Sequence, residues 1–205
     1  MARLALLFAL LLAACATPSA PPAPFFARLS QHCGKAYEGR LVSEDARDAD
    51  WAGKRMVAHW ARCETDRIAI ALHVEDPAAP GGWNRSRTWL VRRDADDALF
   101  LHHDHRHADG VPDAVTLYGG TADPARASRT TQAFPVDAGS IDLFEAQGLT
   151  ASTSNVWQLE LTEDAFVYQL TRTNDATRRF RVRFDLTDPI PAPPPAWGWE
   201  ADPAV

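Results

Sequence analysis

Four of the seven histidines in this 205-residue chain lie within the six residues from 102 to 107. Imidazole rings are good ligands for zinc, copper or nickel. A strand brings every second side chain to the same face about 7 Å apart, so His103 and His105, or His105 and His107, could converge on one metal ion. His103 and His107 would lie roughly 13 Å apart on a straight strand. All three could share a metal only if the chain bends.

A complete metal site would need a further ligand from elsewhere in the fold, and the candidates are His59, His73 and Asp104. The alternative is a polar strand end that runs into the Asp109-Gly110 turn, with its rings solvated or hydrogen-bonded to nearby aspartates. Clustered histidines could also respond to pH, because their charge changes near pH 6.5. Zinc binding by His103, His105 and His107 is therefore one of several open hypotheses.

Two other groups of side chains could form binding sites. Positive charge on the last strands could bind an anionic glycan or lipid headgroup, although a solvated outer face explains it equally. The aromatic residues could line a pocket, although in β-structure they usually form the core. The arginines are Arg172, Arg178, Arg179, Arg181 and Arg183, and the aromatics are Trp51, Trp60, Trp83, Trp89, Trp157, Tyr37 and Tyr168.

The beginning of the chain has the pattern of an export signal. Met1-Ala2-Arg3 carries one positive charge, and an apolar stretch of nine residues follows from Leu4 to Leu12. Such a stretch is too short to cross a bilayer, which takes about 20 apolar residues in a helix. It is typical of a signal peptide.

Leu12-Ala13-Ala14-Cys15 follows this stretch directly and resembles the lipobox of bacterial lipoproteins at all four positions. The resemblance implies a signal peptide over residues 1–14 and a mature chain that starts at lipidated Cys15. Ala16 in the next position goes with the outer membrane in Gram-negative lipoproteins, so we expect an anchor there that faces the periplasm. The alternative is ordinary secretion of a soluble periplasmic protein after cleavage near Ala14-Cys15-Ala16.

The remaining two cysteines form an even pair. Cys33 and Cys63 would see an oxidising compartment after export, where such pairs close into a disulfide. A metal or redox site is the alternative, but the pair lacks a Cys-x-x-Cys motif. We expect a bridge that ties the start of the domain to an early strand.

Proline positions divide the chain. Four of the fifteen prolines lie between Pro18 and Pro24 and six lie from Pro189 onward, so the long middle holds only five. Residues 15–24 are predicted to be the lipidated cysteine and a linker, 25–187 a single domain, and 188–205 a tail rich in proline and tryptophan. Two tryptophans are costly to leave in water, so the tail should lie back on the domain. The formal net charge of −6 gives no indication of a nucleic-acid partner.

The middle of the chain alternates apolar and polar residues over short runs, which is the pattern of half-buried strands. Short turns between these runs favour an antiparallel meander. Two short helices are predicted, at 25–32 and 139–147, and neither could cover a sheet. We expect an all-β fold that closes into an up-and-down β-barrel, with a β-sandwich as the alternative. The predicted strands are 36–42, 54–62, 68–74, 87–92, 99–103, 114–118, 129–136, 155–161, 165–171 and 180–186.

Three features resemble the calycin barrels, which include the lipocalins. They are the short N-terminal helix, the spacing of Gly34, Tyr37 and Gly39 in the first strand, and the arginines of the last strand. The Gly-x-Trp motif usual in that family is absent, so its ligand-binding role does not transfer. The mature chain also resembles uncharacterised bacterial exported lipoproteins with segments similar to His103-Asp104-His105-Arg106-His107 and Tyr118-Gly119-Gly120. That resemblance implies no activity.

These observations leave two main hypotheses. The first is a lipid-anchored barrel of the cell envelope that binds a small molecule or a metal. The second is a structural or interaction protein with a filled core that contacts another envelope protein. Common hydrolase and nucleotide motifs are absent, so we expect a binding or structural protein rather than an enzyme. A cavity inside the barrel would favour the first hypothesis.

Overall fold

The computed structural model describes residues 24–200. The predicted signal peptide, the lipidation site at Cys15 and most of the linker lie outside these residues, as do residues 201–205. Within the described part, no helix is both long and apolar enough to cross a membrane.

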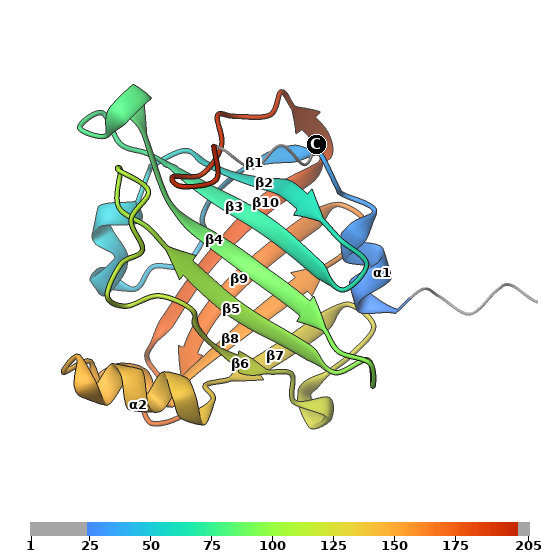
Figure 1. The fold of residues 1–205 in the computed structure, drawn as a ribbon, viewed down its shortest axis with the longest axis vertical. Helices are drawn as coiled ribbons and strands as arrows, with labels where there is room; N and C mark the ends of the chain where they lie inside the picture. The colour runs from blue at the N-terminus through green and yellow to red at the C-terminus, as the bar shows by residue number, and fades with distance from the viewer. Residues whose placement is uncertain (1–23, 201–205) are drawn as a thin grey trace, which may run out of the picture.

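Ten antiparallel strands form one sheet in the order β6-β5-β4-β3-β2-β1-β10-β9-β8-β7. Apart from the β1–β10 pair, each strand lies beside its neighbours in sequence, so the sheet is an up-and-down meander that curls round on itself (Figure 1). The predicted all-β, barrel-like architecture is confirmed. The strands are β1 (Ala36–Leu41), β2 (Met56–Cys63), β3 (Arg67–Glu75), β4 (Trp83–Arg93), β5 (Leu99–His105), β6 (Tyr118–Thr121), β7 (Thr131–Pro135), β8 (Asn155–Leu161), β9 (Ala165–Arg172) and β10 (Arg179–Ile190).

The edge strands β6 and β7 meet and nearly close the barrel. Gly120 pairs with Val136 in an isolated antiparallel bridge, and the amide of Asp137 donates to the carbonyl of Gly119 over 3.0 Å. A Cβ on Gly119 would lie 1.8 Å from the carbonyl oxygen of Leu101, and one on Gly120 would lie 1.9 Å from that of Pro135. The two glycines are therefore needed because this seam leaves no room for side chains.

Two helices lie at opposite parts of the barrel (Figure 1). The first, α1 (Phe25–Ser30), buries Phe25, Phe26 and Leu29 against the core and covers one end. The second, α2 (Ala138–Ala146), is capped by Asp137 and lies beside the seam, where the Ser140 hydroxyl accepts a hydrogen bond from the Gly119 amide over 2.7 Å. Both helices were predicted from the sequence within two residues at each end.

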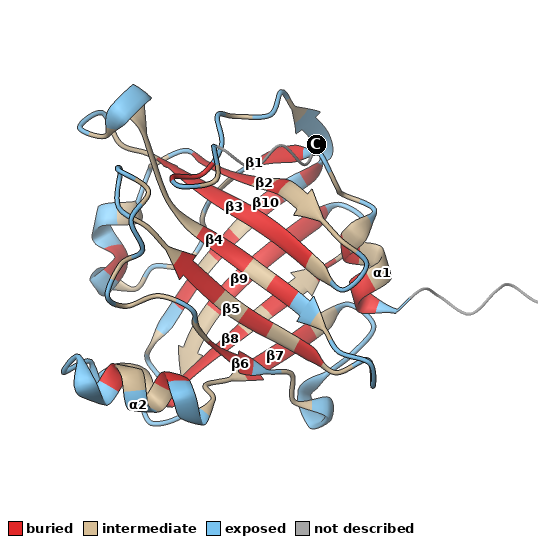
Figure 2. Ribbon diagram, viewed as in Figure 1, coloured by how far each residue is buried: buried red, intermediate tan, exposed pale blue. Residues whose placement is uncertain are grey.

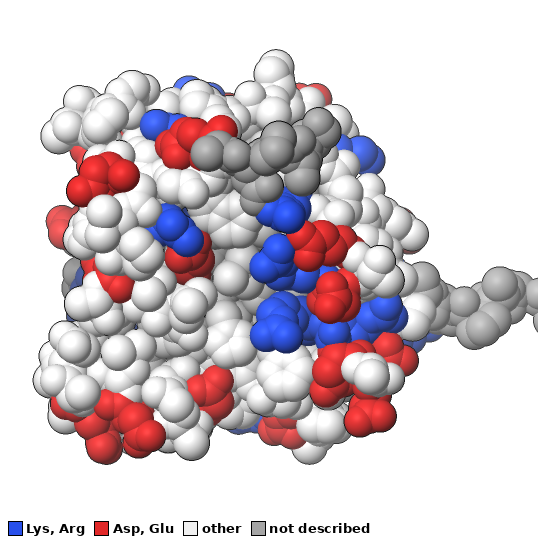
Figure 3. All heavy atoms as spheres, in the orientation of Figure 1, with Lys and Arg blue, Asp and Glu red and all other residues white. Residues whose placement is uncertain are grey.

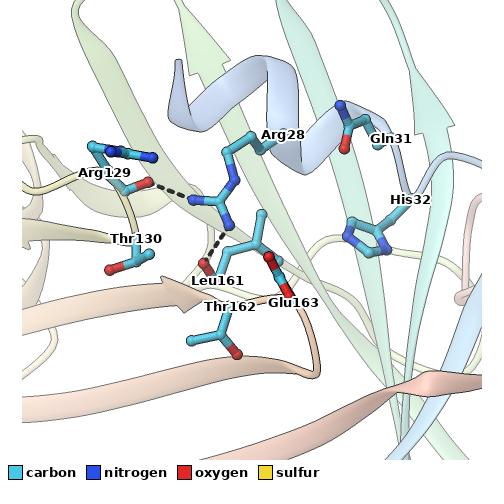
Figure 4. A pocket seen from close by; sticks show the side chains of 8 residues that line it. All are labelled: Arg28, Gln31, His32, Arg129, Thr130, Leu161, Thr162 and Glu163. Carbon is cyan, nitrogen blue, oxygen red and sulfur yellow. Dashed lines mark hydrogen bonds between the residues drawn. The ribbon is translucent and has the colours of Figure 1, made fainter. Parts of the chain in front are cut away.

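Arg28 fastens α1 to the closed end of the barrel. Its guanidinium donates to the carbonyl oxygens of Arg129 at 2.7 Å and Leu161 at 2.9 Å, beside a recess lined by these residues (Figure 4). Both acceptors are backbone atoms near β7 and β8. This cation therefore holds the helix in place through contacts with residues that lie more than 100 positions away in the sequence.

Most strands alternate buried residues inside the barrel with half-buried or exposed residues outside, whereas β3 is buried on both faces from residue 68 to 74 (Figure 2). Toward α1 the interior is filled by large side chains, including Trp60, Phe166 and Phe184. The rings of Trp60 and Phe166 lie 5.0 Å apart in an edge-to-face arrangement. Large aromatic side chains therefore dominate the core in this part of the barrel.

The predicted disulfide between Cys33 and Cys63 is present. Cys33 follows α1 and Cys63 ends β2, so the bridge ties the helical cover to an early strand, as expected.

One predicted strand, 114–118, is displaced. In the structure β6 begins at Tyr118, because the Asp113 carboxylate accepts a hydrogen bond from the Val115 amide and Leu117 has a φ of 56°. Both features belong to turns rather than strands, so residues before Tyr118 form a loop. The Asp113 side chain therefore overrides the apolar alternation of this segment.

The C-terminal tail lies on the outer face of β3, β4 and β5. Trp197 is 7% exposed and its amide donates to the carbonyl of Arg85. The carbonyl of Pro194 accepts from Nε2 of His73 over 2.8 Å, and Nε1 of Trp199 donates to the Asp104 carboxylate over 2.9 Å. The tail thus lies back on the domain, as we predicted from its two tryptophans, and it covers polar side chains on the outside of the barrel.

Candidate ligand-binding cavity

The barrel interior contains a cavity of about 140 Å³ at the part remote from α1. Its walls come from six strands, β3, β4, β5, β6, β9 and β10, from the short 3-10 helix η1 (Ala46–Trp51), and from the turn before β10. Aromatic rings dominate, and several polar side chains share the same space. The lining residues are Asp48, Trp51, Leu72, Arg87, Trp89, His103, His105, Tyr118, Tyr168, Leu170, Arg178 and Phe180.

His103 lies in the wall of this cavity with both ring nitrogens hydrogen-bonded. Nδ1 is 3.1 Å from the carbonyl oxygen of Tyr118, and Nε2 is 2.9 Å from the hydroxyl of Tyr168. A carbonyl can only accept, so the neutral ring donates from Nδ1 and accepts the Tyr168 proton at Nε2. The imidazole also stacks on the Tyr118 ring at 4.7 Å. His103 is therefore held in one tautomer and one orientation.

His105 lies on the same face of β5, one step further toward the strand end. Its Nε2 is 3.1 Å from the hydroxyl of Tyr118, and the two rings meet edge to face at 5.3 Å. The cavity thus contains two histidine–tyrosine pairs, His103 with Tyr168 and His105 with Tyr118.

Burial keeps these groups neutral. It lowers the pKa of His103 to about 3, with smaller contributions from neighbouring positive groups. The pKa of His105 falls to about 4, mainly through burial and next through the nearby charge of Arg87. Burial also raises the pKa of Tyr118 to about 12 and that of Tyr168 well above its usual value. At neutral pH the two pairs therefore supply uncharged donors and acceptors.

An ion pair fastens η1 over the cavity. Arg178, in the turn before β10, donates to the two carboxylate oxygens of Asp48 at 2.6 and 2.9 Å and to Asp45 at 2.9 Å. The bidentate geometry is the strongest that an arginine makes with a carboxylate. These hydrogen bonds raise the pKa of Arg178, the one to Asp48 most of all. This cation is neutralised within the fold.

Arg87 is the second guanidinium in the cavity and its situation differs. Its Cζ lies 5.2 Å from the centroid of the Trp51 ring, and Nη1 donates to the Ser86 hydroxyl over 3.0 Å. Within residues 24–200, no carboxylate lies within 4 Å of this guanidinium. Arg87 is half-buried and leaves most of its five N–H groups available.

The histidine segment is divided between the two sides of the barrel wall. His103 and His105 face the cavity, whereas His102 faces outward with Nε2 3.5 Å from the Asp137 carboxylate. His107 lies beyond β5, largely exposed, with Nε2 3.8 Å from Asp113. The structure therefore brings together two of the three residues predicted to bind a metal.

The three proposed further ligands do not join them. His59 and His73 alternate with the core residues of β2 and β3, and Asp104 lies outside β5 under Trp199. Among the described residues, no group of three His, Cys, Asp or Glu side chains is arranged to hold a metal ion. Zinc binding by these histidines stays a prediction, and the geometry of the described residues adds no support for it.

Arg172 is in phase with Tyr168 and Leu170 on β9 and donates to the Asn155 side chain over 3.1 Å. Arg179, Arg181 and Arg183 lie on the outside of β10 and are partnered. Arg181 contacts Glu160 at 2.8 Å and Gln169 at 3.1 Å, and Arg183 contacts Asp164 at 3.1 Å. On the opposite face, which Figure 3 shows, blue and red side chains also adjoin each other. These surfaces have the character of a solvated outer face with paired charges.

Sequence reasoning did not single out Arg87. The signal was present in the alternation of β4, because Arg87 shares the inward face with Trp89 and Val91. An arginine in phase with two core residues indicates a buried or cavity-lining cation. The partner of Arg178 was equally hidden, since Asp48 lies 130 residues away in sequence.

The fold and the cavity define this protein as an antiparallel, nearly closed β-barrel with a partly polar interior site. No protein-family model matches the chain, and no curated protein matches it either. The resemblance to calycin barrels and to exported lipoproteins stays a prediction.

Proposed function

We propose that the protein is a lipid-anchored binding protein of the bacterial cell envelope whose barrel holds a small organic molecule. The observation that carries this proposal is the interior cavity with its two histidine–tyrosine pairs. Buried polar groups cost free energy unless they are hydrogen-bonded, and an apolar core would avoid that cost. Their concentration around a cavity is typical of a ligand site.

The size of the cavity sets the size of the ligand. An apolar cavity of roughly 150 Å³ can hold one benzene molecule, so the 140 Å³ here suits a single ring with small substituents. Trp89 and Tyr168 stack on each other at 4.4 Å and offer flat apolar surface, while the pairs offer hydrogen bonds. The structural alternative requires a core filled throughout, and the cavity in the part of the barrel remote from α1 favours the binding role over it.

The lipobox supports the cellular part of the proposal. If Cys15 is lipidated, residues 16–24 link it to α1 and span at most roughly 30 Å when extended. The barrel would then stay close to the membrane surface. Globomycin, which blocks lipoprotein signal cleavage, should cause a precursor to accumulate, and a Cys15→Ser variant should lose its acyl mass. A variant that keeps the acyl mass would contradict this anchor.

Native mass spectrometry of the mature protein, purified from an oxidising periplasm without chelator or affinity metal, tests the binding role. We expect an organic mass excess that disappears in Leu170→Trp, because this half-buried residue lines the cavity and a larger ring would fill it. Leu90→Trp, on the outer face of β4, is the matched control and should keep the excess.

A mass excess equal to a metal and lost in His103→Ala would favour the metal hypothesis instead. Absence of any excess, together with no binding of phenol or indole at millimolar concentration by ligand-observed NMR, would contradict the proposed binding role.

A further inference from the structure

We infer that the ligand of this cavity is a small monocarboxylate with a ring-sized apolar body, and that Arg87 binds its carboxylate. This inference rests on the proposed function and adds the chemical class of the ligand. Two guanidinium groups line this cavity, and they differ in what they contact.

Arg178 shows what a structural arginine looks like here. Three hydrogen bonds of 2.6 to 2.9 Å join it to Asp45 and Asp48, and its side chain is 11% exposed. Its charge is satisfied by two carboxylates of the chain, so it attracts no ligand.

Arg87 has no carboxylate partner among residues 24–200. Its Nη1 donates to the neutral Ser86 hydroxyl, and one guanidinium face lies over Trp51. Stacking on an indole fixes the plane of the guanidinium but leaves its edge free. That edge presents parallel N–H donors, which match the two oxygens of a carboxylate. A half-buried cation held in this way is set up for an anion.

The charge of Arg87 reaches the interior of the cavity. It lowers the pKa of His105, as the next cause after burial, and it makes the smallest of the contributions to the lowered pKa of His103, which burial dominates. These two imidazoles are neutral and cannot act as competing cations or as counter-ions. A carboxylate would therefore compensate the positive charge of Arg87, while its ring would lie among Trp89, Tyr168 and Phe180.

The test is calorimetric titration of the mature protein with benzoate and with its neutral analogue benzamide. We expect benzoate to bind at least tenfold more tightly. Arg87→Met should weaken benzoate binding at least tenfold and change benzamide binding less than twofold. Arg87→Lys, which keeps the charge but loses the fork, should give an intermediate loss. Arg92→Met is the matched control because it makes the same change on the outer face of the same strand, and it should have no effect.

The outcomes separate the inference from the proposed function. Equal affinity for benzoate and benzamide, with both lost in Leu170→Trp, would overturn the carboxylate and leave the binding role intact. Failure of both probes to bind would overturn both. Unchanged benzoate binding in Arg87→Met would also overturn the inference. If circular dichroism shows that Arg87→Met is unfolded, Arg87→Gln replaces it. It is judged by the same two changes, the loss of benzoate affinity and the change in benzamide affinity.

Discussion

The hydroxyl of Tyr168 lies 2.9 Å from Nε2 of His103 and joins β9 to β5 through the inside of the barrel. On the side of the seam three strands, β6, β7 and β8, lie between these two, and 65 residues separate the partners in sequence. Tyr168 also stacks on Trp89 of β4, so one side chain links three strands around the cavity. The polar pair is thus part of the packing that shapes the site.

Tyr168→Phe should lower the free energy of unfolding by about 1 to 3 kcal/mol, because Nε2 of the buried His103 would lose its only donor. Urea unfolding measures this change. Tyr37→Phe is the matched control, since its hydroxyl contacts the more accessible His32 and should cost less. Equal losses in both variants would contradict a special role for the cavity pair.

The protein should lose stability as the pH falls from about 6.5 toward 4. Burial lowers the pKa of His73, His103 and His105 to between about 3 and about 4, whereas the unfolded chain keeps the ordinary value of 6.5. The unfolded state therefore binds more protons in this range, so acid favours unfolding. Each histidine contributes at most about 1.4 kcal/mol per pH unit.

Urea unfolding at several pH values measures this slope. His73→Gln should reduce this slope by the contribution of about one bound proton. Glutamine can still donate to the Pro194 carbonyl, but it does not titrate. His107→Gln makes the same substitution at an exposed ring and is the matched control. A slope that is the same in all three proteins would rule out the buried histidine as its source.

Gly120→Ala should destabilise the barrel by about 3 kcal/mol or more, because the added Cβ would meet the Pro135 carbonyl at 1.9 Å. The seam between β6 and β7 would have to open, so hydrogen exchange at the amides of residues 119–123 should accelerate. Gly139→Ala, in α2, is the control, since its Cβ has no contact closer than 3.8 Å. If Gly120→Ala were as stable as the wild-type protein, the seam would have room for a side chain and this prediction would be wrong.

Removing the disulfide through Cys33→Ala and Cys63→Ala should lower the free energy of unfolding by about 3 to 4 kcal/mol. The estimate follows from the loss of a closed loop with a sequence separation of 30 in the unfolded chain. Thermal unfolding with and without reductant measures it. Reductant should affect the wild-type protein alone, and an effect on the double variant would point to another cause.

Local patterns in the sequence determined most of the secondary structure. Alternation predicted the strands because each has one face in the core, and Cys33 and Cys63 formed an even pair in a chain that we predicted to be exported. The strand predicted for residues 114–118 was wrong. The Asp113 side chain imposes a turn there, and the apolar pattern of the segment does not reveal that turn.

The tertiary structure decided which side chains share the cavity. The sequence could place His103 and His105 on one face, but it could not show that Tyr168 and Arg87 would meet them or that Asp48 would neutralise Arg178. Those relations depend on the closure and register of the barrel. Alternation fixes which way a side chain points, whereas its partners across the interior are set by strands that lie far apart in the chain.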